Sequence, residues 1–305
     1  MEIIKPSVEI ITEPDLFKRI ELAARTCYKS EGKIAPGSDL KLFQRLVKSG
    51  HESTLEHSNI VVRLNECAEC DLLALLIEYE GDTGIPAYIR WYTQTPYLVS
   101  GNLRAWRSLA KEFRESLLIR YLFAGHLAFD DLKLSAVDDS TVAEYMPTGI
   151  VPADEAYGDR HNIVTARFTC DRGVSHEAVR HRLLSYSQES TRYVNYKDGA
   201  QFVEPWWWED FPDDQFWLKD SCACADFGYK VAMEHSKNPS PQKARAVLTN
   251  ALKTEVVVTG TVEYWKKLVL PLRISKAAHP DICRIMTMFA EKMRWTEFTK
   301  EKEHE

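Results

Sequence analysis

Residues 180–193 read RHRLLSYSQESTRY. Three arginines, one histidine, one glutamate and four serines or threonines fall within these fourteen residues, in a chain whose formal net charge is −6. Arg180 and Arg182 are only two residues apart, and they follow the largely apolar segment GVSHEAV (173–179). Solvated helix ends more often follow polar segments, so we interpret this cluster as a binding feature that requires an anionic ligand.

The chemistry of the cluster suggests which ligand it binds. Arginine presents a planar fork that makes two-point contacts with phosphate oxygens or carbonyls, and Ser190 and Thr191 add neutral donors. Glu189 can accept a hydrogen bond from a sugar hydroxyl or an imide N–H. The segment therefore predicts a nucleotide site.

Composition limits the other possibilities. A chain of 305 residues with 45% hydrophobic content can bury a large core, as one large domain or two of ordinary size. A sequence pI near 5.9 argues against nucleic-acid binding through the overall field. The start, MEIIKPSVEI, is not followed by a signal-peptide pattern, and no apolar run of about 18 residues is present. We expect a soluble, cytoplasmic protein that binds neither nucleic acid nor membrane.

The cysteines favour a reduced compartment. Seven of them, an odd number, are scattered along the chain. Cys67 and Cys70 have the spacing of half a zinc site, and Cys222 and Cys224 are the candidate second pair. The second pair lies in a predicted helix where Trp217, Cys224 and Val231 keep heptad spacing, and residues two apart on a helix point to different faces. We therefore expect no metal site.

Strand and helix patterns are mixed along the chain without a long linker. This favours an α+β fold with a mixed sheet and packed helices over a regular parallel α/β sheet. The segment from about 80 to 160 is the least regular, and residues 138–160 are typical of an exposed loop. Predicted strands cover 8–11, 59–64, 162–170 and 255–260. Predicted helices begin near Thr12 (the expected N-cap), Asp39, Cys70, Ser175 and Pro241. A further, final helix carries Ile282, Met286, Phe289 and Met293 on one face.

One internal similarity is visible. Residues 99–116 (VSGNLRAWRSLAKEFRES) align without gaps on 258–275 (VTGTVEYWKKLVLPLRIS). The match is compatible with two strand–turn–helix segments that use the same turn chemistry by chance, and equally with an old duplication.

Four motifs in order resemble the flavin-dependent thymidylate synthase family, also called thymidylate synthase complementing proteins. Arg180-His181-Arg182 followed after seven residues by Ser190 is similar to the signature of that family, and SYSQESTRY continues it. The other three motifs are SGHESTLEH (49–57), QKARAVL (242–248) and LRISKAAHP (272–280). Together they span most of the chain, which makes the likeness specific.

The resemblance implies a single domain over residues 1–305, with an insertion at about 80–160 relative to compact members. It implies a homotetramer whose active sites lie at subunit interfaces. The implied reaction converts dUMP to dTMP in de novo dTMP biosynthesis. The carbon donor is 5,10-methylenetetrahydrofolate, FAD carries the hydride, and NADPH is the reductant.

The resemblance also assigns site residues. Arg273 would be catalytic, stabilising negative charge on the pyrimidine, and Arg245 would bind the dUMP phosphate. Residues expected at FAD are His51, Ser53, Arg180, His181, Arg182 and Glu189; residues expected at dUMP are Glu177, Arg180, Gln188, Glu189, Ser190, Thr191, Arg192, Arg245 and Arg273.

The chain departs from the family pattern at three places. Glu177 stands where compact members often have glutamine. Thr261-Val262-Glu263 replaces an Asn-x-Arg pattern that touches flavin, while Asn102-Leu103-Arg104 preserves that pattern in the first of the two similar segments. The stretch WKKLVLPLR (265–273) is one residue longer than usual.

Two alternatives remain open from the sequence. One is a flavin- and folate-dependent enzyme that acts on the same pyrimidine carbon and releases a hydroxymethyl product. The other is a non-catalytic nucleotide-binding homologue that lost flavin. A classical thymidylate synthase is disfavoured, because its nucleophile lies in Pro-Cys-His and none of the seven cysteines has that context.

Overall fold

The strand predicted at 162–170 lies inside a four-stranded sheet. In the computed structural model it forms β7 (Ile163–Asp171), which pairs antiparallel with β2 (Ser7–Ile11). The sheet order is β2-β7-β10-β8, and β10 (Lys253–Thr261) is antiparallel to β8 (Ser185–Gln188). Because side chains alternate along a strand, this sheet presents one apolar face to a core.

The structure describes residues 1–83, 89–92, 97–138, 143–146, 148–151 and 158–299. Their contacts divide the chain into two compact units, each with its own four-stranded sheet. Unit 1 comprises Met1–Thr12, Glu21–Leu42 and Val164–Glu305, and unit 2 comprises Glu13–Ile20 and Phe43–Ile163.

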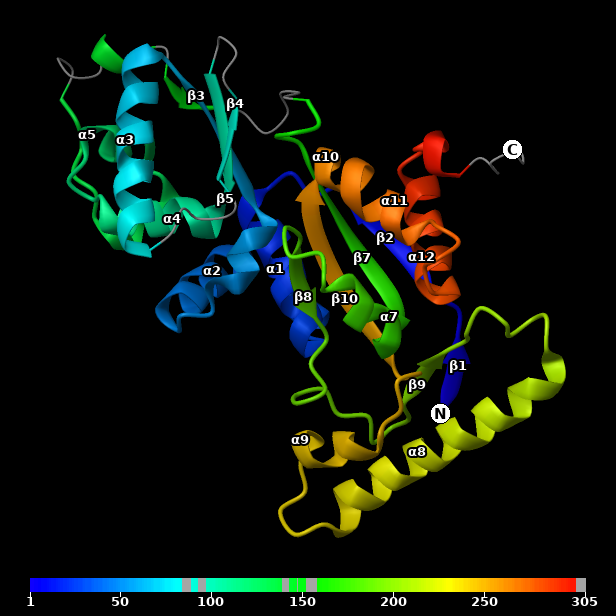
Figure 1. The fold of residues 1–305 in the computed structure, drawn as a ribbon. Helices are drawn as coiled ribbons and strands as arrows, with labels where there is room; N and C mark the ends of the chain where they lie inside the picture. The colour runs from blue at the N-terminus through cyan, green and yellow to red at the C-terminus, as the bar shows by residue number, and fades with distance from the viewer. Residues whose placement is uncertain (84–88, 93–96, 139–142, 147, 152–157, 300–305) are drawn as a thin grey trace. The chain divides into compact units, whose positions relative to one another are not determined.

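Helices cover the apolar face of the unit 1 sheet (Figure 1). These are α7 (Arg172–Ala178), α12 (Pro280–Lys292) and the run formed by α10 (Val262–Tyr264), a π-helical turn η6 (Trp265–Val269) and α11 (Leu270–Arg273). The rings of Trp265 and Phe289 pack with centroids 4.6 Å apart. Strand residues complete this core, chiefly Val8, Ala166, Phe168, Val256 and Val258.

A second, smaller cluster in unit 1 lies under α8 (Gln215–His235). There β1 (Glu2–Ile4) pairs parallel with β9 (Gln201–Val203), and α9 (Pro241–Ala244) packs nearby. Tyr229 on α8 is fully buried in this cluster. Only one side of α8 is therefore used by its own unit.

Unit 2 has the sheet order β4-β5-β3-β6, in which β3 (Asn59–Leu64) is antiparallel to β5 (Tyr97–Asn102). Trp106 and Phe123 are fully buried in its core, and Phe123 stacks on Phe129 with ring centroids 4.3 Å apart. The remaining elements of this part of the chain are β4 (Ile89–Tyr92), β6 (Gly149–Ile150), α3 (Glu66–Thr83), α4 (Leu103–Glu112), α5 (Leu117–Phe123), η2 (Glu52–His57) and η3 (Leu127–Leu132).

The structure confirms the mixed α+β prediction and most predicted elements. The second predicted helix forms α2 (Ser38–Lys48), and Gly50, its predicted stop, has a φ of 71°. Within the described residues no helix is long and apolar enough to cross a membrane. The other helices and short turns are α1 (Leu16–Tyr28), η1 (Glu31–Lys33), η4 (Pro212–Asp214), η5 (Arg245–Val247) and η7 (Thr296–Phe298).

Three local predictions were wrong. The first helix begins at Leu16 and not near Thr12, because the Asp15 carboxylate accepts the amides of Phe17 and Lys18, both at 2.9 Å, and so caps the helix. The helix expected to carry SHEAVRHR ends at Ala178.

The third error concerns residues 138–160, which are not simply an exposed loop. Tyr145 is buried, and its hydroxyl donates to Asp71 Oδ2 at 2.6 Å. For residues 139–142, 147 and 152–157 the exposed-loop prediction is not tested, because these residues lie outside the described part of the chain.

The two similar segments adopt the same local structure, one in each unit. β5 ends at Asn102, whose Oδ1 accepts the Ala105 amide at 2.9 Å, and α4 follows. β10 ends at Thr261, whose Oγ1 accepts the Tyr264 amide at 3.3 Å, and α10 follows. Each side chain satisfies one free amide at a helix N-terminus.

Candidate active site

The arginine cluster lies in a turn after α7. Asp171 caps the helix by accepting the Val174 amide at 2.9 Å, and the helix ends at Ala178. The backbone then turns, with the His181 amide donating to the Ala178 carbonyl at 3.1 Å. As a result, Arg180 and Arg182 leave the helix axis and are exposed on a loop (179–184).

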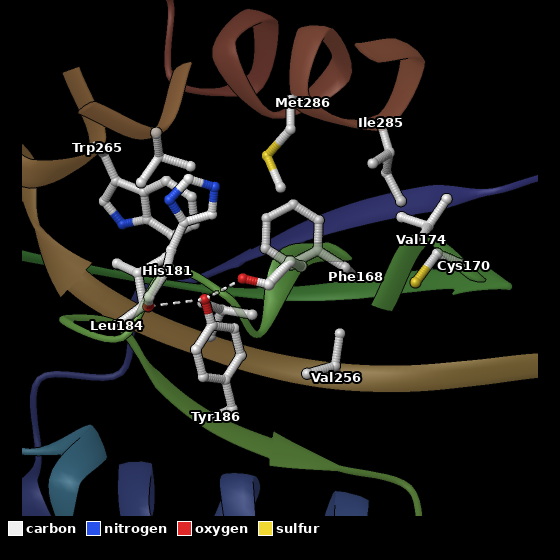
Figure 2. A pocket seen from close by; sticks show the side chains of 13 residues that line it. Phe168, Cys170, Val174, His181, Leu184, Tyr186, Val256, Trp265, Ile285 and Met286 are labelled. Carbon is white, nitrogen blue, oxygen red and sulfur yellow. Dashed lines mark hydrogen bonds between the residues drawn. The ribbon is translucent and has the colours of Figure 1, made fainter. Parts of the chain in front are cut away.

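Close packing against β10 fixes this loop. A Cβ at Gly260 would lie 2.1 Å from Cδ2 of Leu184, so only glycine permits the observed approach. The Tyr186 hydroxyl contacts the carbonyls of Ala178 at 2.6 Å and His181 at 3.1 Å, as Figure 2 shows. The loop is thus held by strand β10 and by a tyrosine of β8.

Arg273 joins the loop to the C-terminal motif. Its Nε donates to Nε2 of His181 at 2.8 Å, its Nη1 to the Glu177 carboxylate at 3.2 Å, and its Nη2 to the Glu177 carbonyl at 3.1 Å. Burial and the neighbouring guanidinium both lower the pKa of His181. Since Nε2 accepts a hydrogen bond, the imidazole is neutral.

A narrow apolar cavity lies behind His181 and is lined by Trp265, Met286 and other core side chains (Figure 2). It holds only about 10 Å3, too little for a nucleotide or a flavin ring. The indole Nε1 of Trp265 is buried there and has no hydrogen-bond partner among the described residues. The cavity therefore serves the packing of the loop and is not a ligand site.

The other end of β8 brings a second set of predicted residues together. Nη1 of Arg245 lies 3.4 Å from Oγ1 of Thr191, and Nε of Arg192 lies 3.4 Å from Oε1 of Gln242. Ser190 is partly buried beside them, and its Oγ accepts the Arg192 amide at 3.4 Å. Both guanidinium groups are exposed and can meet an anion from solvent.

Gln188, the last residue of β8, and Glu189, which follows it, face opposite sides, as the alternation of side chains in extended backbone predicts. Gln188 Nε2 donates to Ser175 Oγ at 2.9 Å and to Thr254 Oγ1 at 3.1 Å, on the α7 side. Glu189 is buried, and its two carboxylate oxygens accept from the Tyr196 hydroxyl at 2.8 Å and from Lys253 Nζ at 2.9 Å.

The contacts of Glu189 continue into a chain of charges that sequence reasoning missed. Lys253 Nζ also lies 2.7 Å from Glu255, and Lys29 contacts the same Glu255 oxygen at 2.8 Å. Burial alone would raise the pKa of Glu255, but hydrogen bonds from both lysines outweigh it and lower that pKa. Lys29, Tyr196 and Lys253 line a cavity of about 480 Å3 with Glu189. No spacing in the sequence connects residues so far apart.

His51 and Ser53 belong to unit 2 and are both exposed; His51 lies at the turn between α2 and η2, and Ser53 lies in η2. Their neighbours Glu52 and Glu56 form ion pairs of 2.6 Å with Lys111 and Arg104 of α4. Within its unit, the motif is therefore fixed to the helix that follows β5. Its role at flavin stays a prediction.

The cysteine pairs do not form a cluster within their units. Cys67 and Cys70 are both exposed on α3, whereas on α8 Cys222 is buried and Cys224 exposed. The described residues contain no group of three or more His, Cys, Asp or Glu side chains that could hold a metal ion.

Comparison with known proteins places these residues in a family context. The family model described as "Thymidylate synthase complementing protein" matches residues 9–69 and 160–296. The protein named flavin-dependent thymidylate synthase from Mycobacterium tuberculosis (strain H37Rv) is 35% identical over 127 residues, which are 37% of this chain and 50% of that protein. The same name is carried by a Mycobacterium avium protein, 34% identical over 127 residues with the same shares of each chain. The chain thus spans about half the length of the curated relatives it matches.

A solved structure is also similar at low identity. The UMP/dUMP methylase PolB from Streptomyces cacaoi, bound with 5-Br dUMP, aligns with a TM-score of 0.40 and 13% identity, covering 98% of this chain and 93% of that chain.

Proposed function

The chain belongs to the thymidylate synthase complementing protein family, whose model matches more than half of its residues, and we propose that it is a flavin-dependent thymidylate synthase. The proposed reaction converts dUMP to dTMP with methylenetetrahydrofolate as carbon donor and FAD and NADPH for reduction. The observation that carries the proposal is the bond between Arg273 and His181. It unites the arginine loop with the last motif, 92 residues away in the sequence.

Arg273 is suited to electrostatic catalysis. The three described bonds engage three of the five N–H groups of its guanidinium and hold the plane of the fork in place. One N–H remains on each Nη for a ligand. A fixed donor pair at a pyrimidine carbonyl would stabilise negative charge as it develops, without a covalent nucleophile.

The loop residues fit a flavin nucleotide. The guanidinium of Arg180 is exposed and has no described partner in the residues that the structure covers, so it is available for a pyrophosphate. Arg182 and His181 belong to the same loop, which Leu184 holds against β10. When bound, the flavin supplies the hydride transfer. A contact of His51 and Ser53 with flavin stays a prediction from the resemblance.

The dUMP phosphate is assigned to the cluster of Arg245, Arg192 and Ser190. Two exposed guanidinium groups and a hydroxyl converge near the end of β8, which suits a doubly charged phosphate. No described hydrogen bond joins Ser190 Oγ to a histidine, and an unactivated serine is a weak nucleophile. Ser190 is therefore assigned to binding.

Buried Glu189 has a different place in the proposal. Both of its oxygens are already engaged by Tyr196 and Lys253, so we assign it to positioning Ser190 and Thr191. A direct contact of Glu189 with FAD or dUMP stays a prediction from the resemblance, as does the homotetramer.

Two assays test the proposal together. The purified protein should retain FAD, seen as the visible absorbance of oxidised flavin. With dUMP, methylenetetrahydrofolate and NADPH it should release dTMP, identified by mass spectrometry. A hydroxymethylated product would replace the proposed reaction with the related one. Protein that takes up no FAD would contradict the enzymatic proposal altogether.

A further inference from the structure

A cavity of about 390 Å3 lies in unit 2, and none of its lining residues is among those predicted at flavin or dUMP. Its walls come from the start of α1, the first residues of β3, the edge strand β6 and residues 161–163, all of which belong to unit 2. Small-molecule sites in proteins typically have volumes of about 300–1,000 Å3. The cavity is therefore large enough to hold a small ligand.

The walls of this cavity are mostly apolar. Ile60, Val61 and Val151 are buried there, and Ile150 lines the cavity from the edge of the sheet. Among the described lining residues, Arg19 is the only lysine, arginine, aspartate or glutamate. The kind of ligand that fits is an apolar body with one negatively charged group.

Arg19, in the first turn of α1, is held along one edge of its guanidinium. Its Nε and Nη2 donate to the Glu13 carbonyl at 2.9 and 2.6 Å. A guanidinium carries five N–H groups, so both on Nη1 and one on Nη2 remain for a ligand. One N–H on each Nη forms the end of the fork, which binds a carboxylate at two points.

The charge of Arg19 has no ion-pair partner within the part of the chain that the structure describes. The carboxylates of Glu13 and Asp15 are near enough to act on this charge, but both accept backbone amides. Glu13 Oε1 accepts the Asp15 amide at 2.9 Å, and Asp15 Oδ1 accepts two amides at the start of α1. Burial lowers the pKa of Arg19 despite these carboxylates. An anion that enters the cavity would offset this desolvation.

A carboxylate matches the cavity better than a phosphate does. One guanidinium balances one negative charge, whereas a doubly charged phosphate is better matched by several cationic groups or a free helix N-terminus. The first amides of α1 are not free, because Asp15 accepts them. Asn59 adds a polar contact: its Nδ2 donates to the His161 carbonyl at 3.3 Å and keeps a second N–H for the ligand.

From these contacts we propose that unit 2 contains a second ligand site, which binds a small organic carboxylate through Arg19 and packs its apolar body against Ile60, Val61 and Ile150. The site is independent of the reaction proposed above, and its test uses no activity measurement.

A matched pair of fluorinated probes tests the charge requirement. The acid, para-trifluoromethylphenylacetate, carries a carboxylate on an apolar ring, and para-trifluoromethylphenylacetamide has the same shape without the charge. In fluorine NMR titrations of the whole chain, the acid should bind with a Kd of about 1 mM or lower, the usual range for a ligand of this size. The amide should bind at least about 10-fold more weakly, because it lacks the charge-assisted hydrogen bonds. Equal binding of the two probes, or no binding of the acid at about 10 mM, would overturn the proposal.

Two substitutions test whether the probes bind in this cavity. Arg19→Gln removes the charge and should weaken binding of the acid at least about 10-fold, with binding of the amide unchanged. Ile150→Trp fills the cavity from a position that is 37% exposed and should block both probes. The matched control is Ile77→Trp on α3, at a 61% exposed position that does not line the cavity, and it should leave both affinities unchanged.

Binding must be separated from folding in these variants. Arg19→Gln also loses the bonds to Glu13, so circular dichroism and thermal unfolding of each variant are compared with the wild type first. If Arg19→Gln does not fold, Ile150→Trp decides, because it leaves Arg19 intact. Wild-type affinity for the acid in Ile150→Trp would contradict the proposal.

A competition experiment tests the class of anion. Inorganic phosphate at the same concentration should not displace the acid from the wild-type protein. Displacement by phosphate would overturn the assignment of the site to a carboxylate.

Discussion

The two strand–cap–helix segments carry the same local chemistry with different outcomes. Each ends a strand at a capping side chain, and each buries a tryptophan completely, Trp106 in unit 2 and Trp265 in unit 1. The indole of Trp106 donates to the Ile60 carbonyl at 3.0 Å, and α4 runs regularly to Glu112. The indole N–H of Trp265 has no hydrogen-bond partner among the described residues, and the helix of Trp265 passes through a π turn.

The π turn, which distinguishes the unit 1 segment from the unit 2 segment, lies just before Arg273, the proposed catalytic residue. A π turn accommodates one extra residue within a helix, and such turns are often found at functional sites. Here the turn spans Trp265–Val269, inside the stretch that the family resemblance predicts to be one residue longer than usual. Pro271 follows, and Arg273 then reaches His181 and Glu177. In unit 2 the regular helix leaves Arg114, the aligned residue, exposed.

The sheets around the two segments also correspond. In unit 2 the chain forms β3, α3, β4 and β5 in succession, and in unit 1 it forms β7, α7 and β8, then β9, α8 and α9, and only then β10. The spatial orders agree over three strands, β4-β5-β3 and β8-β10-β7, whereas the fourth strand differs in connection, because β6 follows β5 in the chain and β2 precedes β7. The agreement over three strands is compatible with an old duplication, which stays a hypothesis.

The largest expected effect on stability comes from the contact that holds the arginine loop. Gly260→Ala would place a methyl group 2.1 Å from Leu184, and the required shift should cost about 1–3 kcal/mol in the free energy of unfolding. Urea unfolding measures it, and FAD retention should fall in parallel. Gly32→Ala is the control, because no atom lies within 4 Å of its added Cβ. Equal stability of both variants would show that the loop does not depend on this contact.

Acid sensitivity should differ between the units. Burial, with Arg19 nearby, lowers the pKa of His57 in unit 2 to about 3, and burial with Arg273 lowers that of His181 in unit 1. An unfolded histidine binds its proton near pH 6.5, so the unfolded state takes up more protons below that pH. Stability is therefore full above pH 6.5 and falls as the pH decreases toward the folded pKa, by at most about 1.4 kcal/mol per pH unit for each group.

This prediction is checked by the slope of stability against pH. His57→Gln should flatten the slope from pH 6.5 down to about 3, and His181→Gln should also flatten it below pH 6.5. The slope is compared, not the absolute stability, because each substitution also alters packing. An unchanged slope in His57→Gln would contradict the assignment of a buried neutral imidazole.

The smallest effect compares the tryptophans themselves. Trp106→Phe and Trp265→Phe remove the same volume from fully buried positions, but only the first loses a described hydrogen bond. Trp106→Phe should therefore cost about 1 kcal/mol more than Trp265→Phe in thermal or urea unfolding. If the two variants lose equal stability, the bond to Ile60 is not what distinguishes the segments.

Local chemistry explains what could be predicted from the sequence. Periodic apolar residues located β3, β7, β10 and α2 to within about one to two residues and predicted the existence of α12, because burial on one face leaves a pattern in the sequence. The end of α7 was misplaced, since the residues after Ala178 are compatible with helix and only packing against Gly260 turns them aside. Tertiary packing leaves no such local pattern.

In the candidate site, too, local motifs were predictable from the sequence and tertiary contacts were not. The motifs grouped Arg273 with the arginine loop, and a hydrogen bond now joins them. The engagement of Glu189 by Lys253 and Tyr196 was not predictable, because it joins residues 64 and 7 positions away through strand pairing. The heptad spacing of Trp217, Cys224 and Val231 on α8 was visible in the sequence, but the sequence does not tell an inward face from an outward one, and the structure shows these three side chains exposed.

The central claim is that Arg273, held by His181 and Glu177, acts on the pyrimidine, while Arg245 holds the phosphate. Arg273→Lys keeps the charge but loses the planar fork. Arg245→Lys weakens a contact that the ground state and the transition state share, so it should act mainly on KM. Arg114→Lys, at the aligned position in unit 2, is the matched control and should leave both constants unchanged.

Steady-state kinetics of dTMP formation with these three variants, each first shown to retain FAD, is the most direct measurement. We predict that Arg273→Lys lowers kcat roughly 100- to 1,000-fold, the usual cost of losing one preorganised donor. We predict that Arg245→Lys raises the KM for dUMP with kcat nearly unchanged. A near-normal kcat in Arg273→Lys, together with a collapsed kcat in Arg245→Lys, would contradict the account and exchange the two roles.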